Sequence, residues 1–257
     1  MLVGVIAICV VLAIYSYPFI KAAWISYTTS WQPVIPNFEP IDFECLPPTA
    51  SGYFDKTAKE LGDEGFTTVA FLRQTNINEN STLYLTILKN KSTKDMACIL
   101  DLTAQVKHIV TNHQKLTFCT EFVDQEVITT SNFNLPTVFK KLPEIKQHKF
   151  PSVRDPKYLY KIHLRLVARA DSGRAKYLPS DGMDVFYLSQ SEAKIMQKQV
   201  DKGMFYLDEE NNVFRPTLKN AFSMVWKLGW PLQNILQNRM KQEELSTLQS
   251  IDMTEQN

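Results

Sequence analysis

A run of 19 uncharged residues at the start of the chain constrains its architecture most. The run extends from Leu2 to Ile20, and Lys21 is the first charged residue after it. An α-helix rises about 1.5 Å per residue, so such a run spans roughly 28 Å, close to the hydrocarbon thickness of a bilayer. The sequence therefore predicts one transmembrane helix over residues 1–23, retained as a signal-anchor.

A cleaved signal peptide and a buried core helix are the alternatives for this run. A signal peptide has basic residues before a short apolar core and small residues at the cleavage site. No Lys or Arg precedes the run, and residues 20–23 match a cleavage site poorly. A retained helix is the favoured interpretation.

Charge and cysteine usage predict where the rest of the chain lies. Lys21, directly after the run, favours placing the remainder in the cytoplasm. The three later cysteines, Cys45, Cys98 and Cys119, are odd in number and lack the spacing of a disulfide framework. A single-pass membrane protein with a cytoplasmic region is therefore favoured over an extracytoplasmic one.

The region after the run has the composition of a folded protein with an uneven charge distribution. The chain is 44% hydrophobic and has a formal net charge of +1. Residues 31–135 contain 8 Lys and Arg against 13 Asp and Glu, whereas residues 136–257 contain 19 against 14. The length suffices for one substantial domain or two small ones.

The residues between the run and the folded region are rich in proline. Residues 24–48 contain prolines at positions 33, 36, 40, 47 and 48. Because proline favours extended backbone, this segment is predicted to be a semi-rigid stalk. A proline-motif ligand is the alternative, but no basic-flanked P-x-x-P pattern is present.

Residues 49–135 indicate one helix followed by an antiparallel β-meander. The helix is expected from Tyr53 to Leu61. After it the hydrophobic period changes to two, which is typical of strands. In the clearest strand, Leu116, Phe118 and Phe122 share one face, and Thr117, Cys119 and Glu121 share the other. The strands are expected over 66–72, 82–89, 96–102, 106–110, 116–123 and 126–130.

Residues 136–241 are predicted to form a basic, mainly helical region with one hairpin. One helix is expected to begin near Asp155, another spans 189–202, and the hairpin covers 204–215. Residues 242–257 are polar and are predicted to be a flexible tail. The predicted fold class is thus α+β, with an N-terminal transmembrane helix, a meander with a packed helix and a mostly helical C-terminal part.

The meander contains a set of residues to test for metal binding: Cys98, His108, His113 and Cys119. Zinc sites usually use close pairs of ligands, and none of these spacings provides one. Strand parity also places Cys98 on the inward face and Cys119 on the outward face. We therefore expect no metal and no cofactor.

A cationic stripe is the strongest binding motif. Lys157, Lys161, Arg165 and Arg169 recur at every fourth residue, so they lie along one side of a helix. A solvated helix face, anionic lipid headgroups and nucleic acid are the three interpretations. Nucleic acid is disfavoured, because it needs a groove-reading element or interleaved stacking aromatics, and only Tyr158 and Tyr160 qualify.

The tryptophans occur only near the ends of the chain. Trp24 and Trp31 follow the uncharged run, and Trp226 and Trp230 lie in the apolar segment 218–236. Tryptophan is enriched at membrane–water interfaces, so these four are predicted interface residues. The segment 218–236 either lies on the membrane surface or packs on the core.

Two classes of function follow. The first is a non-enzymatic binding or scaffold module at the membrane, with the lipid bilayer, anionic headgroups or a membrane protein as partner. The second is a membrane-anchored hydrolase or transferase that uses Cys119 with His113, or carboxylates such as Asp124 and Asp184. An enzyme is less favoured, because no nucleophile elbow, P-loop or dinucleotide-binding motif occurs.

Overall fold

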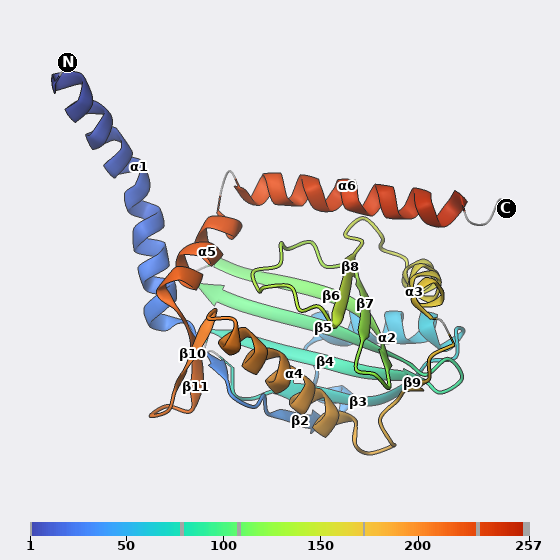
Figure 1. The fold of residues 1–257 in the computed structure, drawn as a ribbon. Helices are drawn as coiled ribbons and strands as arrows, with labels where there is room; N and C mark the ends of the chain where they lie inside the picture. Colours follow the sequence, from blue (N-terminus) through green and yellow to red (C-terminus); the bar gives the residue numbers. More distant parts are fainter. Residues whose placement is uncertain (1, 78–79, 107–108, 172, 230–231, 254–257) are drawn as a thin grey trace. The chain divides into compact units, whose positions relative to one another are not determined.

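The computed structural model describes residues 2–77, 80–106, 109–171, 173–229 and 232–253, and the side chains of this part except those of 2–15, 106, 109, 252 and 253. This part of the chain is α+β. The helices are α1 Leu2–Thr29, α2 Pro48–Gly62, α3 Pro156–Ala170, α4 Asp184–Asp201, α5 Leu218–Leu228 and α6 Leu232–Met253 (Figure 1). The strands are β1 Gln32–Pro33, β2 Phe38–Ile41, β3 Thr67–Gln74, β4 Ser81–Asn90, β5 Asp95–Val106, β6 Ile109–Phe122, β7 Val127–Ser131, β8 Ile145–Lys149, β9 Lys176–Tyr177, β10 Phe205–Asp208 and β11 Val213–Pro216.

The chain divides into two compact units, and each is assembled from separate stretches of sequence. Unit 1 consists of Met1–Val34, Leu135–Lys140 and Lys194–Gln237. Unit 2 consists of Ile35–Asn134, Lys141–Ala193 and Asn238–Asn257. The boundaries differ from the contiguous regions that the sequence suggests, because distant segments pack together.

The sequence predicts a transmembrane helix over residues 1–23, and this prediction is wrong. In the part of the chain that the structure describes, no helix is both long enough and apolar enough to cross a bilayer. Helix α1 does not end with the uncharged run but continues through Lys21 to Thr29. Ala23 is fully buried within the protein. The prediction rested only on the lack of charged residues in the run. Part of the apolar surface of α1 packs inside the protein instead.

Unit 2 is built on a sheet with strand order β2-β3-β4-β5-β6-β7-β8, and β9 pairs with β6. Neighbours from β2 to β7 are antiparallel, and β7 and β8 are parallel. β5 and β6 form a long hairpin, so the separate strand expected over 106–110 does not occur. Residues 107 and 108 lie outside the described part.

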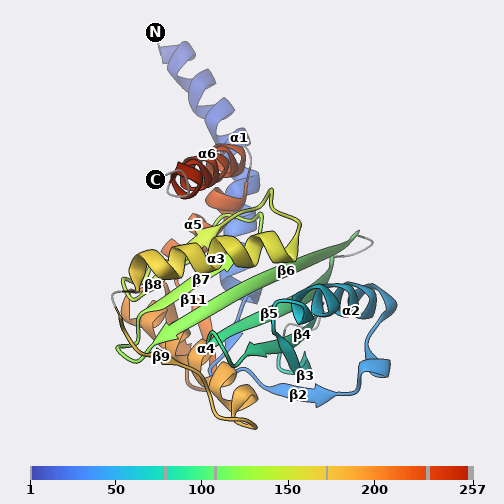
Figure 2. The same ribbon diagram turned by 90° about the vertical axis from the view of Figure 1, so that its right-hand side faces the viewer.

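The main core of unit 2 lies between the sheet and helices α2 and α3, which cover the same face (Figure 2). Leu116, Phe118 and Phe122 of β6 are buried there, on the face that their alternation predicts. Phe54 of α2 and Leu159 of α3 pack in the same cluster. Burying side chains of this size contributes about 1.5–3 kcal/mol each.

The opposite face of the sheet is also covered along β3 and β4. Leu72, Leu85 and Ile87 are buried there and pack against Val185 and Leu188 at the start of α4. Because β4 is covered on both sides, its residues form a continuous buried run from Leu85 to Asn90.

The segments expected to be a stalk and a tail contain regular structure instead. Helix α1 continues to Thr29, and β2 pairs with β3 at the sheet edge, so residues 24–48 are not a simple spacer. Helix α6 continues to Met253. Ile251 is buried in the core of unit 2, and the carboxylate of Glu244 accepts hydrogen bonds from Ser152. The C-terminal segment is therefore part of the fold.

Unit 1 combines a small sheet with a helix pair. Its strands have the order β1-β11-β10, and Met196, Met204, Phe205 and Phe214 form its core. Helices α1 and α5 pack together, with the rings of Phe19 and Trp226 5.9 Å apart. The hairpin β10–β11 is connected through residues 209–212, and Asn212 has a positive φ of 51°.

Candidate functional site

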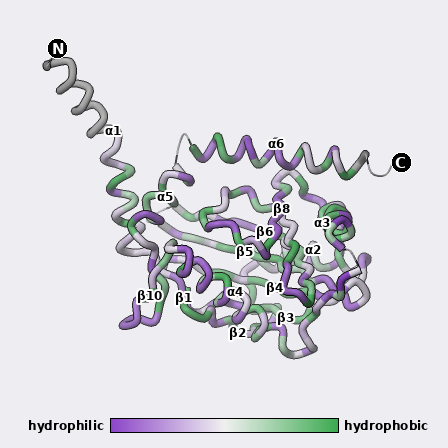
Figure 3. Tube along the Cα trace, viewed as in Figure 1, coloured by the Kyte–Doolittle hydropathy of each residue, from purple (hydrophilic) through white to green (hydrophobic). Residues whose placement is uncertain are grey.

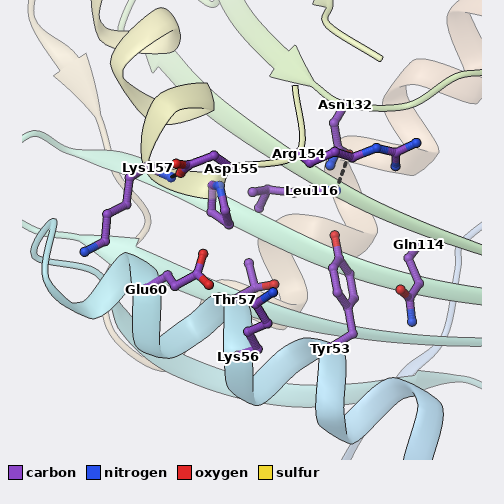
Figure 4. Close-up of a pocket in the computed structure, with 11 residues that line it drawn as sticks. Tyr53, Lys56, Thr57, Glu60, Gln114, Leu116, Asn132, Arg154, Asp155 and Lys157 are labelled. Atoms are coloured by element: carbon purple, nitrogen blue, oxygen red, sulfur yellow. Dashed lines mark hydrogen bonds between the residues drawn. The ribbon is translucent and has the colours of Figure 1, made fainter. Parts of the chain in front are cut away.

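A polar pocket in unit 2 lies between α2, β6 and the residues that begin α3 (Figure 4). Its volume is about 580 Å³, within the usual range for small-molecule sites. The pocket is lined by Tyr53, Lys56, Thr57, Glu60, Gln114, Leu116, Asn132, Arg154, Asp155, Pro156 and Lys157.

One end of this pocket is fixed by hydrogen bonds around Asn132. The Oδ1 atom of Asn132 accepts a hydrogen bond from the backbone N–H of Leu116 at 2.9 Å. Burial raises the pKa of Tyr53, so its hydroxyl is protonated at neutral pH. Gln114 donates to the buried carboxylate of Asp101 at 3.0 Å. These contacts hold the side chains of Asn132 and Gln114 in place.

The pocket contains both signs of charge. Lys56 and Arg154 are exposed, and Lys157 forms an ion pair with Asp63 at 2.5 Å. The carboxylate of Asp155 caps α3 by accepting hydrogen bonds from the backbone N–H groups of Lys157 and Tyr158. The helix N-terminus is thus already satisfied by a carboxylate.

The cationic stripe of α3 is partly engaged within unit 2. Lys157 contacts Asp63, and Arg169 donates to the side chain and backbone oxygens of Ser250 in α6. Lys161 is exposed, and Arg165 is half-buried. The stripe lies on α3 as the sequence predicts, but both of its ends contribute to contacts between elements.

A second candidate is an apolar surface on the helix pair of unit 1. Large apolar side chains that are exposed on α1 and α5 define this apolar surface: Tyr17, Ile20, Trp24, Ile25, Leu218, Phe222, Trp226 and Leu228. Trp24 and Trp226 are the most accessible of the predicted interface tryptophans, at 58% and 60% exposed. Trp31 is half-buried, and Trp230 lies outside the described residues.

Unit 1 is basic, and two of its lysines adjoin the apolar surface. The unit contains eight Lys and Arg and four Asp and Glu. Lys21 on α1 and Lys219 on α5 are exposed beside the apolar side chains. Three of the four acidic residues lie at the hydrophilic tip of hairpin β10–β11, where Asp208 pairs with Arg215 at 2.6 Å (Figure 3). These three acidic residues therefore precede α5 in the sequence and are not part of that helix.

Among the described residues, Cys98, His113 and Cys119 of the meander do not form a site. Cys98 and Cys119 share one face of the sheet, because Cys98 is opposite Thr117 and Met96 is opposite Cys119, so the predicted parity difference is wrong. Burial raises the pKa of Cys98 to about 11 and that of Cys119 to about 12. Neither thiol is a reactive thiolate at neutral pH.

No group of three or more metal-ligating side chains occurs in the described part of the chain. His113 is six residues from Cys119 on the same strand, which separates them by about 20 Å. His108 lies outside the described residues. The Cys119–His113 pair therefore cannot act as nucleophile and base.

The carboxylates suggested for catalysis have structural partners. Asp124 pairs with Arg174 at 3.0 Å, which lowers the pKa of Asp124. Asp184 is buried and pairs with buried Lys89 at 2.5 Å. Neither carboxylate lines the pocket.

A buried polar network joins α3 to the sheet. His163 is fully buried, and its two ring nitrogens lie 2.9 Å from the hydroxyls of Thr120 and Thr130. Thr120 also donates to Asp95 at 2.6 Å, so it must accept from the Nε2–H of His163. Tyr160 donates to Asp95 as well. The sequence indicates a buried His163, but it did not reveal the network, whose only signal is polar residues at inward strand positions.

No family model, curated protein or solved structure matches this chain. The function must therefore be inferred from the chemistry of the protein's surfaces. The pocket of unit 2 and the apolar surface of unit 1 are the two features with binding chemistry. They belong to different units, and each is considered by itself.

Proposed function

We propose that this protein is a non-catalytic binding module that docks on an anionic membrane surface. The apolar surface of unit 1 is the observation that carries this proposal. Interfacial helices insert aromatic and aliphatic side chains between lipid headgroups while basic side chains remain at the headgroup level. Such docking requires no helix that crosses the bilayer.

The spacing of the exposed residues supports a continuous contact. On α5, Leu218, Phe222 and Trp226 are four residues apart and form one stripe. On α1, Ile20 and Trp24 have the same spacing. The stripes approach each other where the Trp226 ring contacts Phe19. Exposed apolar patches of this kind mark interaction sites in folded proteins.

Charge favours an anionic membrane as the partner. Lys21 and Lys219 flank the exposed aromatic residues, and unit 1 has a formal net charge of +4. Anionic headgroups attract basic side chains that are held near the surface. Tryptophan is also enriched at this depth. A purely apolar protein partner would leave the two lysines without a complementary group.

No observation favours the hydrolase or transferase. The two thiols have raised pKa values, and the acidic candidates are paired with Lys89 and Arg174. A binding function is therefore the better account of the exposed chemistry.

Vesicle binding by the full chain tests this proposal. All four tryptophans lie in unit 1, so their fluorescence reports on that unit alone. We expect co-sedimentation with vesicles that contain anionic lipid, a blue shift of the emission, and quenching by brominated acyl chains. Vesicles of neutral phosphatidylcholine should bind less protein.

The double variant Phe222→Ser/Trp226→Ser should bind anionic vesicles at least about tenfold more weakly, because burying each aromatic ring contributes about 1.5–3 kcal/mol. Phe186→Ser is the matched control, since Phe186 is 58% exposed on α4 in unit 2. Equal binding by the double variant and the native protein would exclude α5 from the interface. Self-association without vesicle binding would assign the apolar surface to a second copy instead.

A further inference from the structure

Two cations that line the pocket of unit 2 are not paired with carboxylates. In the described part of the chain, neither Lys56 nor Arg154 forms an ion pair. The neighbouring lysines of the same elements do: Lys59 pairs with Asp55 at 2.7 Å, and Lys157 pairs with Asp63 at 2.5 Å. Of the three cations that line the pocket, Lys56 and Arg154 are thus the two without a carboxylate partner.

Tyr53 adds a hydrogen-bond donor at the Arg154 end of the pocket. Burial raises the pKa of Tyr53, and the nearby Asn132 side chain lowers it in part. The Asn132 amide oxygen accepts from the backbone N–H of Leu116. The hydroxyl proton of Tyr53 has no acceptor in the described part of the chain. Figure 4 shows this hydroxyl pointing toward the side of the pocket where Asn132 and Arg154 lie.

The other end of the pocket disfavours negative charge. Glu60 and Asp155 lie there with Lys157, which is already neutralised by Asp63 (Figure 4). Leu116 and Pro156 form an apolar part of the lining. An occupant therefore places its anionic group beside Tyr53 and Arg154 and a neutral or positive portion toward Glu60.

We infer that this pocket binds a small organic oxyanion, either a phosphate monoester or a carboxylate. Arg154 and Tyr53 donate hydrogen bonds to the anionic oxygens, and Lys56 supplies further positive charge. The pocket volume of about 580 Å³ exceeds that of a bare phosphate ion and accommodates an organic portion over Leu116 and Pro156. Charge-assisted hydrogen bonds of this kind are the strong ones in anion recognition.

Calorimetric titration of the full chain at constant ionic strength tests the site. The probes are glycerol 3-phosphate, succinate and inorganic phosphate. Arg154→Gln should weaken binding about ten- to hundredfold, and Tyr53→Phe about three- to tenfold, because one charged and one neutral hydrogen bond are lost. Glu60→Gln should tighten binding several-fold, because it removes a like charge.

Lys161→Gln is the matched control, because Lys161 is exposed on α3 and lies outside the pocket lining. It should leave binding unchanged. Binding of glycerol 3-phosphate alone or succinate alone would support the site and identify the anion as phosphate or carboxylate. Binding that is equal in Arg154→Gln and Lys161→Gln, or no binding of any of the three probes, would overturn the inference.

Discussion

At the residue scale, His163 shows how one buried side chain links folding to pH. Burial lowers its pKa to about 4 from an ordinary value of 6.5. The ring accepts a hydrogen bond from Thr130 and donates one to Thr120, so its neutral form is fully satisfied. Protonation would add a hydrogen to Nδ1, and this new N–H would point at the Thr130 hydroxyl, which already donates to the same nitrogen. The neutral imidazole is therefore the form that the fold selects.

A pH-dependent loss of stability follows from this residue. Between pH 6.5 and 4 the unfolded chain protonates His163 and the folded chain does not, so the free energy of unfolding falls as the pH falls. The difference of about 2.5 pKa units corresponds to about 3 kcal/mol. Denaturant titrations of the native protein and His163→Asn across this range measure it. The variant is expected to be less stable at pH 7 and to have a shallower pH dependence; parallel profiles would contradict this origin.

At the element scale, glycine has opposite roles in α2 and at the end of α5. Gly229 caps α5, and a Cβ atom there would lie 2.8 Å from the backbone oxygen of Val225 and 3.0 Å from Phe19. Gly52 lies inside α2 with open space around it. The first glycine permits the close approach of α5 and α1, and the second only weakens its helix.

Alanine substitutions separate these roles. Gly229→Ala is expected to destabilise unit 1 by about 1–3 kcal/mol, because the new Cβ atom would overlap the backbone oxygen of Val225, which cannot move without disturbing α5. Gly52→Ala is expected to stabilise the protein by about 0.5–1 kcal/mol, because alanine favours the helix. Circular dichroism during chemical unfolding measures both. A neutral effect of Gly229→Ala would mean that α1 and α5 can separate at little cost.

At the scale of the whole molecule, the chain passes repeatedly between the two units. Residues 238–257 return to unit 2 after the chain has built most of unit 1. Ile251 is 1% exposed in the core of unit 2, although it lies near the end of the chain. Unit 2 is therefore not a contiguous domain, and its stability depends on its last helix.

Two substitutions in α6 test this dependence. Ile251→Ala is expected to lower the free energy of unfolding by about 2–5 kcal/mol, because it leaves a cavity in the core. Leu245→Ala, at a site that is 59% exposed, should change it little. Equal effects of the two substitutions in thermal or denaturant unfolding would show that α6 does not contribute to the core.

The sequence by itself determined local structure where one pattern repeats. The alternation of Leu116, Phe118 and Phe122 identified the inward face of β6, and Asp155 identified the start of α3. These signals are local, because side-chain direction in a strand and hydrogen bonding at a helix end depend on neighbouring residues.

Only the tertiary structure decided how distant segments are used. It gave α1 a helical partner in place of the expected span, placed Cys98 and Cys119 on one face, and brought Ile251 into the core. It also brought Tyr53 and Arg154, a hundred residues apart in the chain, to one pocket. Such contacts depend on strand register and on which apolar surfaces meet, and composition and periodicity encode neither directly.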